Sequence, residues 1–295
     1  MAYLPKLKPA IGNQLGGMPE RTKGVPVRGE MTFAIPGAYT WIVPEGVTSV
    51  SIVCVGGGGG STHADLATDY RNGGGGGSLA WVNNVSVASG DEVNVLVGEG
   101  GFGQPLGGTP ISDGGNSDAV VKGVTVVEAG GGKAGPDAAS AALGGVVIVG
   151  SGGSGGAGGS SVDTNNNYTS SGGGAGGYSG DGGDGIETVN STVAGNAGAG
   201  GAGGSGGGTT STIGGAGGVG IFGEGPSGAG GAGTGSIGGG GGSGGQNGYD
   251  NETRSGLFGG GGSLTASISG HGGSGAVRIL WGKGRAFPST DVGQS

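Results

Sequence analysis

The sequence predicts a mainly β protein with a non-α repeat: a small antiparallel β-sandwich joined to a polyglycine II helix bundle and closed by a C-terminal strand. Glycine supplies 90 of the 295 residues, far above the roughly 7% of ordinary globular domains. Few side chains therefore remain to fill a conventional core. Short segments with alternating apolar residues stand before and after the long glycine-rich region, as in antiparallel strands with one buried face.

The strands are predicted from apolar residues at every second position. In residues 49–55, for example, Val50, Ile52 and Cys54 fall on one face. Comparable segments lie at residues 39–43, 78–85, 92–97, 124–129 and 146–149. Residues 276–281 alternate in the same way, so we expect this last strand to pair with the early ones and to close the bundle. Cys54 is the only cysteine, which makes it core filler and excludes an intramolecular disulfide.

The glycine runs between residues 144 and 275 favour a packed lattice over a flexible linker, which is the alternative. Linkers are rich in polar residues, whereas Ala, Val, Ile and Phe interrupt these runs and only 11% of the chain is charged. Continuous runs such as residues 238–242, with only 11 prolines in the chain, do not fit collagen. Polyglycine II helices have three residues per turn and no Cβ, so neighbouring chains can form N–H···O and Cα–H···O bonds.

Four parts are expected along the chain. Residues 1–30 form an extended arm, residues 31–143 the β-sandwich with glycine-rich inserts, residues 144–275 the bundle with projecting loops, and residues 276–295 the closing strand and tail. The net charges are +3 for the arm, −13 for residues 31–275 and +2 for the last part. An acidic body argues against nucleic acid as a partner, because phosphate binding needs clustered Lys and Arg. The cationic arm either grips a neighbour in an assembly or is disordered.

No apolar stretch approaches 18 residues, and residues 1–30 lack the apolar core of a signal peptide. We therefore expect a protein that is made in a cytoplasm and does not insert into a membrane.

Motifs for catalysis and cofactors are weak. Residues 98–103 match GxGxxG, but Pro105 and Pro110 forbid the helix that a dinucleotide site requires. His63 and His271 have no ligand residues at metal-binding spacing. No nucleophile stands in a pattern that would pair it with a histidine. The sequence therefore predicts neither an enzyme nor a bound cofactor; calcium binding by Asp or Glu stays open.

Candidate binding residues lie in the glycine-poor segments between the runs. These segments combine Tyr, Asn, Asp and Arg, which hydrogen-bond to and stack on sugars or loops of a partner. Solvated turns are the alternative interpretation. The predicted receptor-binding residues are Tyr70, Arg71, Asn166, Tyr168, Tyr249, Asp250 and Arg254.

Both ends of the body resemble a known family. Residues 32–50, TFAIPGAYTWIVPEGVTSV, precede a glycine run and resemble the opening of the glycine-rich domain found in many phage tail proteins. Residues 275–290, GAVRILWGKGRAFPST, are similar to the C-termini of such proteins. The region between resembles, in composition and alternation, the distal tail-fibre adhesins of T-even-like phages, which stack polyglycine II helices and present variable loops to a receptor.

The resemblance implies a phage virion structural protein, at a tail fibre or tail tip, that mediates host attachment. Its implied partners are other virion proteins, through residues 1–30, and a bacterial surface receptor, either a glycan or an outer-membrane protein. It implies exposure on the released particle, and a homotrimer is one assembly that it allows. The alternatives are a virion decoration protein without receptor binding and an ice-binding polyglycine II protein.

Overall fold

The computed structural model describes residues 28–62, 70–103, 110–136, 140–162, 169–188, 195–201, 204, 214–232, 238–249, 254–264 and 269–288. Within these ranges the regular secondary structure is entirely β, and no helix occurs. The strands are β1 (Gly29–Phe33), β2 (Gly37–Ile42), β3 (Ser49–Val55), β4 (Tyr70–Asn72), β5 (Leu79–Ser86), β6 (Glu92–Val97), β7 (Ser117–Val121), β8 (Val124–Ala129), β9 (Val147–Val149), β10 (Ser151–Gly153), β11 (Ser160–Val162), β12 (Thr169–Ser170), β13 (Glu187–Thr188) and β14 (Ala276–Trp281).

Most strands belong to two open, antiparallel sheets of five strands each. The first has the order β1-β14-β3-β5-β10 and the second the order β2-β6-β7-β8-β9. Two further pairs, β4 with β11 and β12 with β13, stand apart from them. The C-terminal strand β14 lies between β1 and β3, with Ile279 opposite both Met31 and Ile52. The prediction that the last strand pairs with the early ones is therefore confirmed.

Two clusters of apolar side chains cover the two faces of the first sheet. One cluster joins it to the second sheet, because alternate residues such as Ile52 and Val277 are buried with Val95 and Val127. Cys54 belongs to this cluster and is fully buried. The other cluster contains the intervening residues of the first sheet, with Tyr178, Val219, Ile221 and Phe287 from outside it. The strands β3 and β14 are thus buried on both faces.

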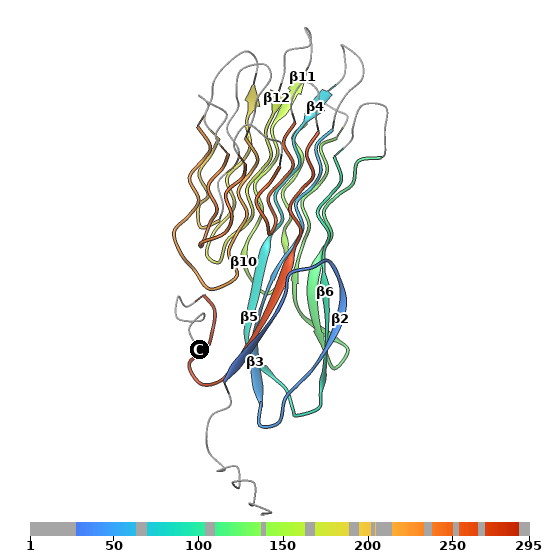
Figure 1. The fold of residues 1–295 in the computed structure, drawn as a ribbon, viewed down its shortest axis with the longest axis vertical. Helices are drawn as coiled ribbons and strands as arrows, with labels where there is room; N and C mark the ends of the chain where they lie inside the picture. The colour runs from blue at the N-terminus through green and yellow to red at the C-terminus, as the bar shows by residue number, and fades with distance from the viewer. Residues whose placement is uncertain are drawn as a thin grey trace, which may run out of the picture.

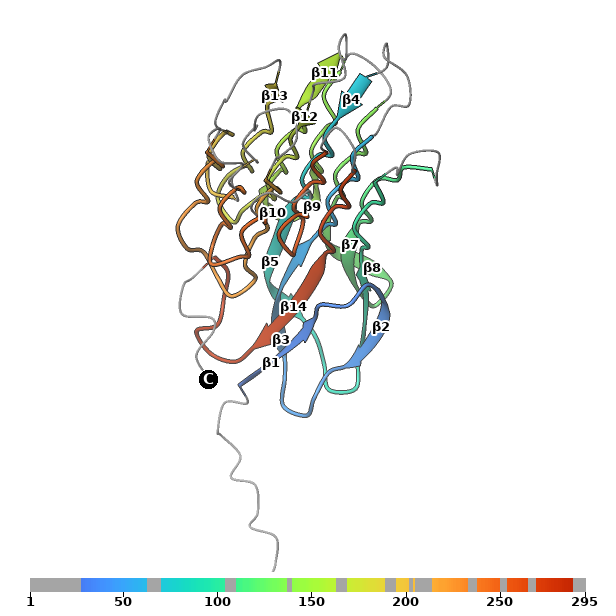
Figure 2. The ribbon, with the colours of Figure 1, turned by 45° about the horizontal axis from the view of Figure 1, so that its top comes forward.

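Extended, glycine-rich runs lie side by side beyond one end of the sheets (Figures 1 and 2). In the run 73–78, N–H groups three residues apart donate to the same neighbouring run, and successive N–H groups donate to three different runs. The N···O distances are 2.7–3.0 Å. The donor and acceptor residues are Gly73 and Gly159, Gly76 and Gly156, Gly74 and Gly262, Gly77 and Gly259, Gly75 and Lys133, and Ser78 and Gly130.

Glycine is required in these runs because neighbouring backbones approach too closely for a side chain. A Cβ on Gly75 would lie 2.1 Å from the carbonyl oxygen of Leu143, and one on Gly58 would lie 2.1 Å from that of Gly260. Real Cβ atoms do not come this close to backbone oxygens. The N–H and C=O groups that would otherwise be buried without partners are paired between runs instead.

The bundle crosses the boundary expected at residues 143 and 144. Early runs, at residues 56–60 and 73–77, bond directly to late ones, at residues 155–159 and 259–262. Residues 147–153, from the later part, supply β9 and β10 to the two sheets. Within the described residues no helix has the length and apolarity needed to cross a membrane.

Candidate partner-binding surface

The structure brings together two of the predicted receptor-binding residues, Tyr249 and Arg254. The backbone N–H of Tyr249 donates to the carbonyl oxygen of Arg254 at 3.2 Å, so the two residues lie next to each other. The guanidinium carbon of Arg254 lies 5.3 Å from the centroid of the Tyr249 ring. This distance is within the range of a cation–π contact. The two side chains are thus held as one unit at the surface.

Gln246 positions this unit from the preceding segment. Its Nε2 donates to the hydroxyl oxygen of Tyr249 at 2.9 Å. Its Oε1 accepts from the backbone N–H of Leu257 at 3.0 Å. One side chain therefore ties the segment before Tyr249 to the segment after Arg254. The phenol ring is fixed at both ends, by this bond and by its own backbone.

A pocket of about 420 Å³ lies beside Tyr249 and Arg254. His271 supplies another wall; its Nδ1 accepts from the N–H of Gly103 at 3.1 Å, and its ring packs edge-on against Phe102 at 5.5 Å. We call this site the Tyr249 pocket. Its lining residues are Gly100, Gln246, Tyr249, Arg254, Ser255, Leu257, His271, Gly272, Gly273 and Ser274.

Large apolar surface is exposed at this site. Tyr249 is 39% exposed, Leu257 51%, and Phe102, beside His271, 53%. Aromatic residues and arginine are the residues that most often dominate binding energy at interfaces. A rigid ring, a forked donor and an aliphatic side chain therefore surround one hollow in a region that is otherwise mostly glycine.

Arg71, another predicted site residue, does not line this pocket. Arg71 lies in β4 and is only 4% exposed, so its side chain offers little surface to a partner. Tyr70 begins the same strand, and its side chain is outside what the structure describes. Asn166, Tyr168 and Asp250 also lie outside the described residues.

Sequence reasoning did not include Gln246, Leu257 or His271 in the site. The sequence shows no ligand residues at metal-binding spacing from His271, whereas its neighbours in space come from residues 100–103, 246–249 and 254–257. Gln246 and Leu257 are near Tyr249 and Arg254 along the chain, whereas no local pattern could have revealed His271, because the register between distant runs creates its contacts.

Metal binding has no support within the described ranges, where no group of three His, Cys, Asp or Glu side chains converges. Several of the acidic side chains have a structural role instead. Oδ1 of Asp181 accepts from the N–H of Ser154, and Oδ1 of Asp184 accepts from that of Ala157, both at 2.7 Å. The two carboxylates, three residues apart, thus accept from two N–H groups that are also three residues apart, at the outside of the bundle.

Comparison with curated proteins gives no match. The sequence model of a glycine-rich domain matches residues 32–282, which include both five-stranded sheets except the first part of β1, the described glycine-rich runs and the Tyr249 pocket. The match spans most of the chain, and the chain belongs to the glycine-rich domain family.

Proposed function

We propose that this chain is a structural protein of a bacteriophage particle, at a tail fibre or tail tip, that contacts a bacterial surface receptor through the Tyr249 pocket. The observation that carries the receptor role is the exposed Tyr249–Arg254 pair beside a pocket of about 420 Å³. The link to phage particles rests on the resemblance of residues 32–50 and 275–290 to phage tail proteins.

The chemistry of the pocket suits recognition better than catalysis. Tyr249 offers a flat ring for stacking on a sugar or an apolar side chain, and Arg254 offers forked N–H donors for hydroxyl or carboxylate oxygens. The hydroxyl of Ser255 donates to the backbone oxygens of Gly261 and His271, so it is not poised as a nucleophile. We therefore infer binding of a glycan or an outer-membrane protein loop, without a reaction.

The scaffold supports this role because the glycine-rich runs provide stability while projecting side chains provide specificity. We infer that the glycine-rich runs are polyglycine II helices, because their hydrogen bonds repeat every three residues toward the same neighbour. We infer likewise that the two sheets form a β-sandwich, since one buried cluster contains side chains of both. Glycine cannot discriminate among ligands, so recognition falls to the few side chains that project from the lattice.

Attachment to the particle is assigned to residues 1–30. Arg28, the first described residue, donates through its guanidinium to the carbonyl oxygen of Lys283 at 3.1 Å. The first residues of β1 thus lie beside the C-terminal segment, at the end of the sheets that faces away from the bundle (Figure 2). A tail-fibre protein would be held at this end while the bundle reaches outward.

The receptor role is tested by binding the isolated chain to host cells in a flow-cytometry assay. The double change Tyr249→Ala and Arg254→Ala should weaken binding about 30-fold, since each hot-spot residue contributes about 1 kcal/mol or more. The control is Lys122→Ala with Leu143→Ala, two exposed residues that do not line the pocket. Both proteins should unfold at nearly the parent temperature.

Parent-like cell binding by the Tyr249 and Arg254 variant would remove the receptor assignment. A role as a virion decoration protein would then be favoured, provided that antibodies still find the chain on particles.

A further inference from the structure

A second pocket, of about 470 Å³, lies where β3 begins and β14 ends. The other ends of these strands continue into the glycine-rich runs (Figure 2), so this pocket lies at the strand ends that face away from those runs. We call it the Lys283 pocket. The residues that matter for its chemistry are Thr48, Ser49, Ser51, Asn84, Lys283 and Arg285.

A β-bulge places Asn84 at the wall of this pocket. Val50 pairs with Val85 and Ile52 with Val82, so two residues, Asn83 and Asn84, stand opposite Ser51. Asn84 has a φ of 57°, in the left-handed region that few residues other than glycine adopt. Bulges of this kind redirect side chains and recur beside functional sites.

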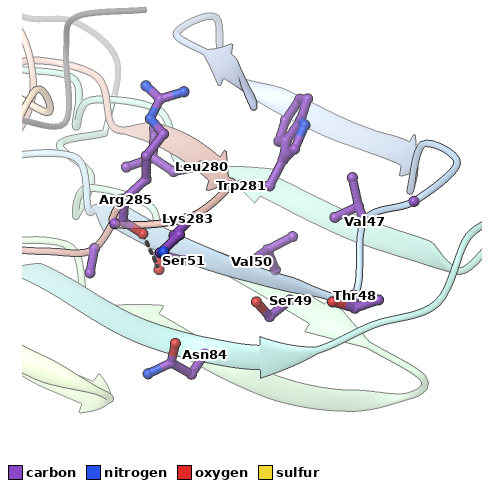
Figure 3. A pocket seen from close by; sticks show the side chains of 14 residues that line it. Val47, Thr48, Ser49, Val50, Ser51, Asn84, Leu280, Trp281, Lys283 and Arg285 are labelled. Atoms are coloured by element: carbon purple, nitrogen blue, oxygen red, sulfur yellow. Dashed lines mark hydrogen bonds between the residues drawn. The ribbon is translucent and has the colours of Figure 1, made fainter. Parts of the chain in front are cut away.

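The two asparagines of the bulge differ in what they contact. The amide of Asn83 donates to the carbonyl oxygen of Phe287 at 2.6 Å and accepts from its N–H at 2.9 Å. These bonds hold the C-terminal segment against the face of the first sheet that lies opposite the second sheet. Figure 3 shows Asn84 on the same side of β3 as Ser49 and Ser51, with Lys283 above them. Asn84 is thus left to face the pocket.

Four polar side chains around this pocket are available to bind a ligand. Thr48, Ser49, Asn84 and Lys283 are all exposed. Among the residues that the structure describes, none of their side chains has a hydrogen-bond or ion-pair partner. Hydroxyl groups, an amide and an ammonium can all donate to the same ligand. Their convergence favours a ligand that is rich in acceptor oxygens.

Lys283 supplies a cation that can attract a ligand, because its ammonium group has no ion-pair partner among the described residues. The guanidinium of Arg285 donates to Oε2 of Glu30 and to the carbonyl oxygen of Gly29. Glu30 in turn bonds Arg278, so one carboxylate is shared by two guanidinium groups. Among the residues that the structure describes, no carboxylate lines the pocket. The local charge is therefore positive, in contrast to the net charge of −8 of the whole chain.

We propose that the Lys283 pocket binds a carboxylate side chain of an acidic peptide from the protein to which this chain attaches. One ammonium group matches a monoanion, whereas a phosphate dianion would call for several clustered cations. The guanidinium of Arg28 reaches the carbonyl oxygen of Lys283, so a partner gripped by residues 1–30 would lie beside this pocket. The choice of a peptide rests on the proposed attachment to a particle.

The test is an NMR titration of the ¹⁵N-labelled full chain. The probe is a blocked peptide of alternating glutamate and glycine, and its matched control has glutamine in place of glutamate. We expect the amides of Ser49, Asn84 and Gly284 to shift with the first peptide only. Methyl glucuronide and inorganic phosphate serve as the competing carboxylate and phosphate ligands.

Two variants report on the assigned contacts. Lys283→Gln removes the charge, and Asn84→Gly removes the amide while glycine accepts a φ of 57° without strain. Each should weaken peptide binding about twofold to fivefold. Lys133→Gln, which alters an ion pair with Asp113 elsewhere in the molecule, should leave it unchanged.

Equal shifts with the glutamine peptide would overturn the carboxylate assignment, and so would tighter binding of phosphate. Shifts with methyl glucuronide alone would overturn the peptide in favour of a sugar acid. Because this titration uses no cells, its failure is distinguishable from failure of receptor binding at the Tyr249 pocket.

Discussion

Position 156 has no room for a methyl group, while the next position already carries one. A Cβ on Gly156 would lie 2.2 Å from the carbonyl oxygen of Gly183 and 2.5 Å from its carbon. Both are backbone atoms in a neighbouring run, so no side chain can rotate away. Ala157, by contrast, is partly exposed at the outside of the bundle. The two positions form a matched pair within one run.

Gly156→Ala would force the two runs apart by about 1 Å. Gly156 donates to the carbonyl oxygen of Gly174 at 2.8 Å and accepts from Gly76 at 2.9 Å, so the shift also weakens bonds to two further runs. Overpacking costs about 1–3 kcal/mol, and each weakened buried bond adds about 1 kcal/mol. We expect the free energy of unfolding to fall by about 3 kcal/mol.

Equilibrium urea denaturation, followed by circular dichroism, measures this loss. Ala157→Ser is the control, and its free energy of unfolding should stay within about 0.5 kcal/mol of the parent. If Gly156→Ala instead matches the parent with an unchanged urea dependence, the close approach of the runs is not what stabilises the bundle. The same reasoning would then fail at the other closely packed glycines.

Two further predictions concern buried charge and the thiol. Burial alone would raise the pKa of Glu30, but hydrogen bonds from Arg285 and Arg278 outweigh it and hold this pKa below its ordinary value. Glu30→Gln should lower the free energy of unfolding by about 2 kcal/mol at pH 7 in a denaturation assay, which is less than the loss of a fully buried pair. The difference in this free energy between variant and parent should shrink as the pH falls below about 4, because Glu30 of the parent is then protonated through its lowered pKa. A constant difference down to pH 2 would contradict the ion-pair account. Cys54 is fully buried, and burial raises the pKa of its thiol. Iodoacetamide at pH 8 should label the native chain at least about a hundredfold more slowly than the chain in urea; equal rates would mean that the core is open.

The strands of the two sheets could be predicted because alternation is a local signal. Residues 92–97 are apolar at every second position, and the burial of β6 alternates in the same way, with Val93, Val95 and Val97 buried. The position of the C-terminal strand followed from a pattern that resumes after the glycine-rich region. These inferences needed only the pleat of a strand and the burial of one face.

The extent of the bundle was less accessible to sequence reasoning. Runs of pure glycine have no side chains to mark their partners, so nothing local indicates that residues 73–77 bond to residues 155–159 and 259–262. The boundary at residue 144 was placed where glycine becomes most frequent, although membership of the bundle depends on packing. The Tyr249–Arg254 pair was accessible because its members are five residues apart, whereas His271 reaches the pocket through the lattice register.

Arg278 gives the strongest reason to regard the sheets and the bundle as one structure. Alternation in β14 puts this arginine on the face opposite Val277 and Ile279, where an exposed charge would be ordinary. Instead it is fully buried, with its guanidinium 4.5 Å from the Phe222 ring and bonded to the carbonyl oxygen of Ile221.

Burying a guanidinium costs several kcal/mol unless its donors are paired. Glu30 and the backbone at Ile221 supply acceptors for it, one from β1 and one from the later glycine-rich region. A bundle that only flanked the sheets loosely would leave Arg278 in water. Its complete burial therefore requires that residues 219–222 pack firmly on the first sheet. The C-terminal strand thus contacts both the sheet and the later glycine-rich region and holds them together.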